Sequence, residues 1–333
     1  MYFNSKINPV LFIAEVGSNH EGNYSEAKKL VINACNSRAD VVKLQILNAE
    51  NLVSKKYDRK RYNHFKKLEL SIEQNKKLCK IIKLKKKKCS ASIWDVDQID
   101  IFKKYVDIFK VGSGDIHNFE IIKKIIRTNK PLIISTGLCN INDIKKTISF
   151  INSVNRFYIK SKKLALLHCN TAYPTPKEDV CLGTLDYLMK EFSIPVGYSD
   201  HSIGKEIITY AFLKGAKIIE KHFSNNLKKK SFRDHEISLN KKGVNNYLRN
   251  INKISEYLNT RYSQTKSEKK QKNLYSFRRS IYAKKNIGKG ELFSNKNLIC
   301  LRPYKKDNSK KYFNLVNKKS KLKYKKGDLI NLW

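Results

Sequence analysis

Short apolar runs alternate with amphipathic segments along most of the chain. The runs are rich in β-branched residues and end at polar or glycine-containing turns, which is typical of buried strands. Eight such runs are present: Leu11–Val16, Ala39–Leu44, Cys89–Ser92, Ile108–Val111, Leu132–Ser135, Leu164–Leu167, Val196–Tyr198 and Ala216–Lys221. Lysine-rich segments with helical periodicity begin near Tyr24, Ser71, Val96, Asn118, Ile141, Leu182 and Gly204, and an eighth covers Lys241–Asn259.

Eight strand–helix units in residues 1–260 have the size and order of a (β/α)8 barrel, which we predict for a first domain. A doubly wound sheet is the alternative, although such sheets usually contain fewer strands. Residues 261–276 are polar and basic without an apolar period, so we expect a linker there. Residues 277–333 change to short strands at Ser280–Ala283 and Leu298–Leu301 with glycine turns between them, which predicts a small β-rich domain.

The composition excludes several classes of protein. Hydrophobic residues make up 41% of the 333 residues, which is enough for a packed core and too much for a disordered chain. No run approaches the roughly 18 apolar residues of a membrane span, and the N-terminal apolar run lacks a signal-peptide cleavage pattern. The seven cysteines are scattered and form no Cys-x-x-Cys motif. We therefore expect a reduced, cytoplasmic protein with no membrane partner.

The formal charge of +40 raises the class of nucleic-acid-binding proteins. Arg supplies only 11 of the 69 basic residues, however, and Arg is the side chain that best reads bases and clamps phosphates. The lysines are dispersed over predicted outer helix faces, as at Lys28, Lys103 and Lys123. We therefore expect no nucleic-acid partner, and we expect the positive field to attract small anionic substrates.

The carboxyl ends of the predicted strands carry most of the candidate chemistry. In a (β/α)8 barrel these ends and the loops after them form the active-site face. Lys43 and Lys110 interrupt apolar strands, and an interior lysine is costly without an anionic partner. Hydroxyl and carboxyl groups follow at other strand ends: Glu15, Ser92, Ser113, Asp115, Thr171, Tyr173 and Ser199. This set suits a small anionic substrate, and a phosphorylated one best.

Two histidines mark a candidate metal site. His201 and His222 end adjacent strands that lie about 4.8 Å apart, so both imidazoles can reach one divalent ion. Glu15 neighbours the last strand after closure and is a candidate third ligand, while Asp234 lies in the long loop over the same face. The alternative is a pair of structural histidines. We expect three further histidines in loops or at the surface: His20, His64 and His117.

Seven motifs carry a family resemblance. They are IAEVGSNHEGN (Ile13–Asn23), ADVVKLQ (Ala39–Gln45), FKVGSGDI (Phe109–Ile116), PLIISTG (Pro131–Gly137), LLHCNTAYPTP (Leu166–Pro176), GYSDHSIG (Gly197–Gly204) and IEKHFS (Ile219–Ser224). With them the chain resembles the sialic acid synthase family, whose members condense phosphoenolpyruvate with amino sugars to make nonulosonic acids. The stretch FRRSIYAKKNIGKGELFS (Phe277–Ser294) resembles the antifreeze-like (SAF) domain that follows the barrel in this family.

The resemblance implies roles for individual residues. It makes His201 and His222 ligands of a divalent metal, Mn²⁺ in the family with Mg²⁺ or Co²⁺ as alternatives, and it makes Glu15 and Asp115 catalytic partners of these histidines. Phosphoenolpyruvate would be bound by Lys43, Ser92, Lys110, Ser113, Thr171 and Ser199. The acyclic sugar would be contacted by Asp115, Tyr173 and Asp234. Arg302 would reach the sugar's N-acyl group in the partner subunit of a domain-swapped homodimer.

The expected function is therefore a nonulosonic acid synthase. It would join phosphoenolpyruvate to an N-acyl-mannosamine-type aldose with metal assistance, and release phosphate by C–O cleavage. A 3-deoxy-sugar-acid synthase that acts on a phosphorylated sugar is the nearest alternative, but those enzymes lack the small C-terminal domain. A nucleic-acid-binding protein or an ice-binding small domain would leave the polar strand ends unexplained.

Overall fold

The computed structural model describes residues 2–229, 231–258, 263, 265–270, 273–305 and 309–331. The chain divides into two compact units, residues 1–258 and 259–333. Eight parallel strands form the first unit: β1 Leu11–Gly17, β2 Val41–Ile46, β3 Lys88–Ile93, β4 Ile108–Val111, β5 Leu132–Ser135, β6 Leu164–Cys169, β7 Val196–Asp200 and β8 Ile218–His222. Because β1 pairs with both β2 and β8, the strands close in chain order. The predicted (β/α)8 barrel is confirmed, and the doubly wound sheet is excluded.

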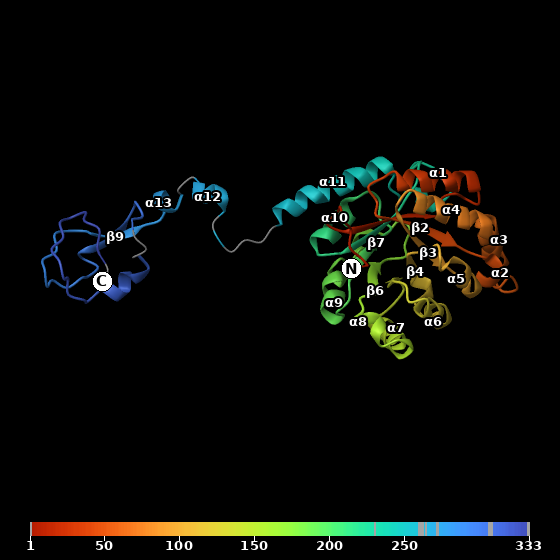
Figure 1. The fold of residues 1–333 in the computed structure, drawn as a ribbon, viewed down its shortest axis with the longest axis horizontal. Helices are drawn as coiled ribbons and strands as arrows, with labels where there is room; N and C mark the ends of the chain where they lie inside the picture. The colour runs from red at the N-terminus through yellow and green to blue at the C-terminus, as the bar shows by residue number, and fades with distance from the viewer. Residues whose placement is uncertain are drawn as a thin grey trace. The chain divides into compact units, whose positions relative to one another are not determined.

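Helices cover the outside of the barrel between successive strands (Figure 1). They are α1 Tyr24–Cys35, α2 Ala49–Leu52, α3 Arg59–Leu68, α4 Ile72–Leu84, α5 Val96–Phe102, α6 Phe119–Arg127, α7 Ile141–Val154, α8 Phe157–Lys160, α9 Gly183–Glu191, α10 Glu206–Leu213 and α11 Lys241–Tyr257. Side-chain caps fix several starts, such as Asn23 for α1 and the Ser71–Gln74 capping box for α4. No helix among the described residues is long and apolar enough to cross a membrane.

Two strands begin two residues later than predicted, and β3 begins one residue earlier, at Lys88 instead of Cys89. β2 begins at Val41 rather than Ala39, because the Asp40 carboxylate accepts a hydrogen bond from the Phe12 amide at 2.9 Å and ends the loop there. β8 begins at Ile218 rather than Ala216, because the Ala216 amide still bonds to the Ala211 carbonyl in the turn after α10. Local side-chain and turn bonds thus set the ends of strands whose apolar centres were predicted correctly.

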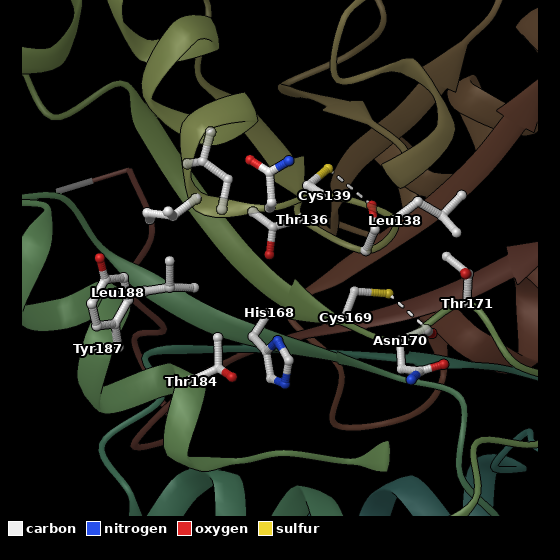
Figure 2. A pocket seen from close by; sticks show the side chains of 14 residues that line it. Thr136, Leu138, Cys139, His168, Cys169, Asn170, Thr171, Thr184, Tyr187 and Leu188 are labelled. Carbon is white, nitrogen blue, oxygen red and sulfur yellow. Dashed lines mark hydrogen bonds between the residues drawn. The ribbon is translucent and has the colours of Figure 1, made fainter.

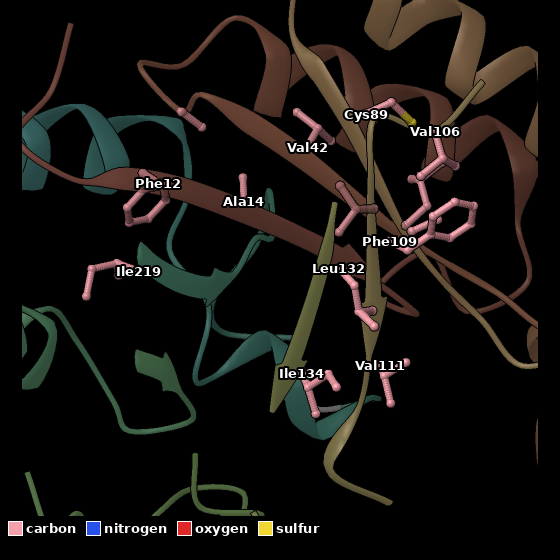
Figure 3. Close-up of a cluster of buried hydrophobic side chains, with 14 of the residues drawn as sticks. Phe12, Ala14, Val42, Cys89, Val106, Phe109, Val111, Leu132, Ile134 and Ile219 are labelled. Carbon is pink, nitrogen blue, oxygen red and sulfur yellow. The ribbon is translucent and has the colours of Figure 1, made fainter. Parts of the chain in front are cut away.

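The barrel has two apolar layers that follow from strand alternation. Outward-facing residues such as Phe12, Val42 and Phe109 pack beneath the helices (Figure 3). Inward-facing residues fill the amino-terminal half of the barrel: Leu11, Ile13, Val41, Ile108, Ile133, Ala165, Leu167 and Ile218. On β1, β2, β4 and β8 the next inward position is charged, so the apolar floor supports a polar layer towards the carboxyl end.

The second unit contains the two predicted strands. β9 Ser280–Ala283 and β10 Leu298–Leu301 pair antiparallel over a small core that includes Ile281, Phe293 and Tyr324. Isolated bridges connect the remaining segments: Tyr282 of β9 pairs with Leu329, and Ile287 pairs with Tyr324. A short helix, α14 Tyr312–Leu315, completes the unit. The unit is β-rich as predicted, and its likeness to an SAF domain stays a prediction.

The predicted linker is partly helical. It holds α12 Lys266–Lys270 and the start of α13 Asn273–Phe277. Thr265 begins α12 with a capping pair, because its hydroxyl accepts from the Glu268 amide at 3.3 Å and its own amide donates to the Glu268 carboxylate at 2.7 Å. The sequence pattern missed α12 because the helix is exposed and buries no apolar face. Residues 261, 262, 264, 271 and 272 of the predicted linker lie outside the described residues.

Candidate active site

Two lysines and two glutamates form one buried network at the carboxyl end of the barrel. Lys43 Nζ on β2 lies 3.1 Å from Glu15 Oε2 on β1 and 3.1 Å from Glu220 Oε2 on β8. Lys110 Nζ on β4 lies 3.3 Å from Glu220 Oε1, and Ser199 Oγ on β7 donates to the same oxygen at 3.0 Å. All five side chains are buried. The interior lysines thus have the anionic partners that their burial requires.

The charges in this network favour an additional anion. Burial raises the pKa of Glu220, but Lys110 and Lys43 lower it much further, so Glu220 is ionised. Burial raises the pKa of Glu15 to about 7 even though Lys43 opposes the shift. Two ammonium groups therefore face one ionised carboxylate and one carboxyl that is only partly ionised near pH 7. The cluster carries excess positive charge, which a small anion would neutralise.

A glycine brings two hydroxyl residues together beside the lysines. Ser113 Oγ accepts a hydrogen bond from the Gly137 amide at 3.1 Å. A Cβ on Gly137 would lie 2.7 Å from Ser113 Oγ and 2.9 Å from Thr171 Cγ2, so only glycine fits this approach. Ser92 pairs with Lys110 in the register of β3 and β4. The predicted residues Ser92, Ser113 and Thr171 therefore gather at the end of the barrel that carries the network.

A pocket of about 330 Å³ opens beside these residues. Figure 2 shows Thr136 and Cys139 on one side of it, and Cys169 and Thr171 on the other. Gly137 and Thr171 both line the pocket. This open space borders the ends of β5 and β6, whereas the two lysines and two glutamates of the network do not line it.

His201 and His222 lie together, as their strand positions predicted. Their ring centroids are 5.5 Å apart. His201 Nδ1 lies 2.5 Å from the Asn170 carbonyl oxygen, and because that oxygen can only accept, Nδ1 carries the proton and Nε2 is left with a free lone pair. Burial lowers the pKa of His201 to about 4 and lowers that of His222 well below its usual value. Both imidazoles are therefore neutral at pH 7, the form that binds metals.

The atoms around His222 fit a divalent metal ion. His222 Nδ1 and Glu15 Oε1 are both buried without a hydrogen-bond partner. A Cβ on Gly17 (φ +55°) would lie 3.2 Å from Glu15 Oε1 and 3.5 Å from His222 Nδ1, so glycine keeps this small space open. Imidazole nitrogen and carboxylate oxygen are donors that Mn²⁺ and related ions accept. Within the described residues, no three His, Cys, Asp or Glu side chains converge tightly enough to hold a metal by themselves.

The loops after β6 and β8 cover the histidines. Tyr173 stacks on His201 with ring centroids 4.0 Å apart and meets His222 edge-on at 6.1 Å. The Arg233 guanidinium lies 4.3 Å above the Tyr173 ring. Asp234 Oδ2 lies 3.5 Å from His222 Nδ1, and burial raises the pKa of Asp234 to about 6 while Arg233 opposes the shift. Tyr173 and Asp234 thus border the same space as the two imidazoles.

The loop after β8 contacts the loop after β1 through one carboxylate, that of Glu21. Glu21 Oε1 accepts from Lys229 Nζ and, at 2.9 Å, from Ser231 Oγ. His235 Nε2 lies 3.1 Å from the same oxygen, and its Nδ1 lies 2.7 Å from Ser224 Oγ. Burial alone would raise the pKa of Glu21, but these donors lower it to about 2. The loop over the histidines is therefore held by several hydrogen bonds to a single ionised side chain.

Two further predicted residues are Asp115 and Arg302. Asp115 is half-buried at the end of the short 3₁₀ helix Ser113–Asp115, where burial raises its pKa and Trp94 and Asn118 oppose the shift. Arg302 belongs to the second unit, where its Nε donates to the Phe277 carbonyl at 3.0 Å and its guanidinium lies over the Phe277 ring.

The sequence prediction missed one central residue of the network. Glu220 was not among the predicted site residues, although it forms ion pairs with both lysines and accepts a hydrogen bond from Ser199. Its alternation with His222 on β8 was the available signal, because both must face inward. His20 lies in the turn after β1, within the predicted loop or surface class, but its side chain is buried and its Nδ1 accepts from the Gly22 amide at 3.0 Å.

Catalytic sites of (β/α)8 enzymes lie at the face where this network lies, and the protein is an enzyme of that class. Residues 30–263 match the model of the NeuB family, and the chain belongs to that family. The resemblance to the sialic acid synthases is thereby confirmed.

Similar proteins include named synthases. The chain is 35% identical to the N,N'-diacetyllegionaminic acid synthase of Campylobacter jejuni subsp. jejuni serotype O:2, over 96% of this chain and 98% of that protein. It is 29% identical to the pseudaminic acid synthase of Campylobacter jejuni subsp. jejuni serotype O:23/36, over 96% and 95%. The solved N-acetylneuraminic acid (sialic acid) synthetase of Leptospira borgpetersenii serovar Hardjo-bovis matches with a TM-score of 0.72 and 28% identity, over 80% of this chain and 91% of that one.

Proposed function

We propose that the protein condenses phosphoenolpyruvate with an N-acyl amino aldose to give a nine-carbon 2-keto sugar acid and phosphate. The observation that carries this proposal is the buried pair Lys43 and Lys110 beside two neutral histidines at one barrel end. The names of the similar synthases, which refer to legionaminic, pseudaminic and N-acetylneuraminic acids, support the product class. An aldose that leads to a legionaminic acid is the first candidate, because the legionaminic acid synthase is the more similar of the two Campylobacter enzymes.

Phosphoenolpyruvate binds in this account at the lysine network. Its phosphate and carboxylate replace part of the interaction between the two ammonium groups and Glu220, and they neutralise the excess positive charge. The hydroxyl side chains complete its binding site: Ser92, Ser113, Thr171 and Ser199. The backbone at Gly137 can approach the ligand closely because glycine has no side chain. A side chain at that position would fill the space between Ser113 and Thr171.

The acyclic sugar binds beyond the histidines. Tyr173, Asp234 and Asp115 provide hydrogen-bonding groups for its hydroxyls. Arg302 of a second copy contacts the N-acyl group, which makes a homodimer with exchanged small domains the active unit. The reaction takes place in the cytoplasm, where the free thiols of all seven cysteines stay reduced.

His201 and His222 hold a divalent metal ion, for which Mn²⁺ is the first choice and Mg²⁺ or Co²⁺ are alternatives, with Glu15 close by. The unpartnered His222 Nδ1 and Glu15 Oε1 are the features that support this assignment. The bound ion would polarise the aldehyde of the sugar.

The chain's own side chains then act on the two reactants. Carbon 3 of phosphoenolpyruvate forms a bond to the aldehyde carbon, water adds to carbon 2, and the bond between carbon 2 and the phosphate oxygen breaks. Lys43 and Lys110 stabilise the negative charge on the departing phosphate. Glu15, whose pKa burial raises to about 7, can accept the proton of the attacking water. Tyr173 and the loop after β8 limit the access of other water.

The test is phosphate release from phosphoenolpyruvate by purified protein with Mn²⁺ and a panel of acyl amino aldoses, with and without chelator. The expected result is chelator-sensitive release that depends on one free sugar. Release that requires a sugar phosphate would contradict the free-sugar substrate and would favour a synthase that acts on a phosphorylated sugar, either a 3-deoxy-sugar-acid synthase or one that makes a phosphorylated nonulosonic acid. Release without any sugar would indicate a phosphatase.

A further inference from the structure

We propose that Asp200, Ser202 and Lys221 form a positioning cluster on the outer side of the barrel that holds His201 in place against His222. The inference rests on the proposed metal-binding function of these histidines. It concerns side chains that face away from the site and contact none of the reactants.

The cluster joins the ends of two neighbouring strands. Asp200 on β7 and Lys221 on β8 are register partners, and Lys221 Nζ lies 2.5 Å from Asp200 Oδ2. Lys221 Nζ also donates to the Ser202 carbonyl. The Ser202 amide donates to Asp200 Oδ1 at 3.0 Å, and its hydroxyl donates to Oδ2 at 3.0 Å. The Lys221 ammonium group therefore bonds to both residues that flank His201, namely Asp200 and Ser202.

Side chains alternate between the two faces of a strand, so the outward-facing ion pair also restrains the neighbouring inward-facing histidines. Asp200 immediately precedes His201, and Lys221 immediately precedes His222, so the ion pair links the two residues that come directly before the histidines. The loop after β6 holds the His201 ring through the Asn170 carbonyl and the Tyr173 ring. The positioning cluster restrains the backbone of His201, while the loop after β6 restrains its ring.

The burial of the pair indicates a role beyond stability. Both side chains are 0% exposed. An ion pair in such a place gains little over apolar residues of the same size, because the desolvation of both charges offsets their attraction. An apolar pair would pack the same space without tying the turn at residues 200–202 to β8. The restraint on His201 is what the charged pair adds.

The experiment compares Mn²⁺ affinity and thermal stability in the full-length protein and its Asp200→Asn/Lys221→Met double variant. Asn still accepts from Ser202, and Met has nearly the volume of Lys, so the melting temperature should change little. Free Mn²⁺, measured by electron paramagnetic resonance during titration, should show about 10-fold weaker binding, as for other residues that orient metal ligands. The turnover number should recover at saturating Mn²⁺, which a misfolded site would not show.

Two further variants keep the result interpretable. Asp186→Asn/Lys214→Met makes the same change in an exposed ion pair and should leave Mn²⁺ affinity unchanged. Ser202→Ala removes a single hydroxyl donor to Asp200, and it should weaken Mn²⁺ binding a few-fold even if the double variant folds poorly. Unchanged Mn²⁺ affinity in the cluster variants would overturn the positioning role alone. A parent protein that binds no Mn²⁺ would overturn both this inference and the proposed metal site.

Discussion

Glu220 is the residue on which the buried charges depend. Its two oxygens face Lys43, Lys110 and Ser199. In the substrate-free site they are the negative partners of ammonium groups that would otherwise lack enough negative charge. The pattern of the chain shows that Lys43 and Lys110 interrupt apolar strands, and this alone predicts an anionic partner. The pattern does not say which carboxylate that partner is, because the answer depends on how the strands close into a barrel.

We expect Glu220→Gln to destabilise the ligand-free barrel and to make phosphoenolpyruvate a stronger stabiliser. Removal of one member of a buried ion pair leaves uncompensated charge and typically costs about 3–5 kcal/mol. Phosphoenolpyruvate would resupply negative charge to the two lysines. Thermal melting with and without phosphoenolpyruvate checks both effects.

The matched control is Glu191→Gln, which breaks the exposed pair with Lys145. Such a surface pair contributes about 0–1 kcal/mol, so this variant should melt close to the parent. An equal loss of stability in both variants would mean that Glu220 does not hold the lysines together.

Lys110→Met should lower the turnover number by about 100-fold or more while the fold survives. The methionine fills the space of the lysine, but the departing phosphate loses a charged contact, and such contacts are typically worth about 3–4 kcal/mol in the transition state. Steady-state kinetics of phosphate release measure the effect. Lys124→Met, at an exposed pair with Asp100, is the control and should keep full activity. Near-normal turnover of folded Lys110→Met would exclude the assigned role.

At the scale of elements, the fold could be predicted because each strand is a short apolar run with a polar turn behind it. The eight runs predicted the strands, and helical periodicity predicted helix starts near Tyr24 and Ser71, where the structure has the caps Asn23 and Ser71. The start of β2 could not be read from hydrophobicity, since it depends on the bond from the Phe12 amide to Asp40 across the strand pair. Helix α12 was missed because a capping pair, and no apolar face, forms it.

The loop between β8 and α11 should depend on Glu21. Glu21→Gln keeps the shape of the side chain and weakens its interactions with Lys229 and His235. Because these are partly exposed contacts worth about 1 kcal/mol, the KM for the sugar should rise on the order of 5-fold with little change for phosphoenolpyruvate. Kinetics with each substrate varied in turn separate the two. A change confined to phosphoenolpyruvate would contradict the role of this loop in sugar binding.

The pH dependence of this contact has a defined sign. The pKa of Glu21 is lowered from 4.5 to about 2, so its stabilising contribution is complete above pH 4.5 and is lost only as the pH falls towards 2. The loop should therefore stay closed across the neutral range, and changes in activity there should come from other groups.

At the scale of the whole molecule, the barrel and the small unit are each defined, and their functional connection is the dimer proposed above. Arg302 lies in the small unit, whereas the histidines lie in the barrel. The charge of +40 belongs to dispersed surface lysines, and it should speed the arrival of phosphoenolpyruvate at low salt without determining specificity.

Two inactive variants should restore each other if Arg302 acts in the partner's site. Arg302→Ala and His222→Ala chains, refolded together, form mixed dimers in which one of the two sites has both native residues. Random pairing should then recover about a quarter of the parent's activity. Each variant refolded alone is the control. If mixing recovers nothing while mixed dimers are demonstrated, Arg302 acts in its own chain or in neither site.

The most direct test of the central claim is mass spectrometry of the product formed from phosphoenolpyruvate and a free acyl amino aldose, together with phosphate measured in the same reaction. The account predicts a phosphate-free acid with three more carbons than the sugar, formed one-for-one with phosphate and abolished by chelator. Phosphate without the acid, or an acid that retains the phosphate, would contradict it.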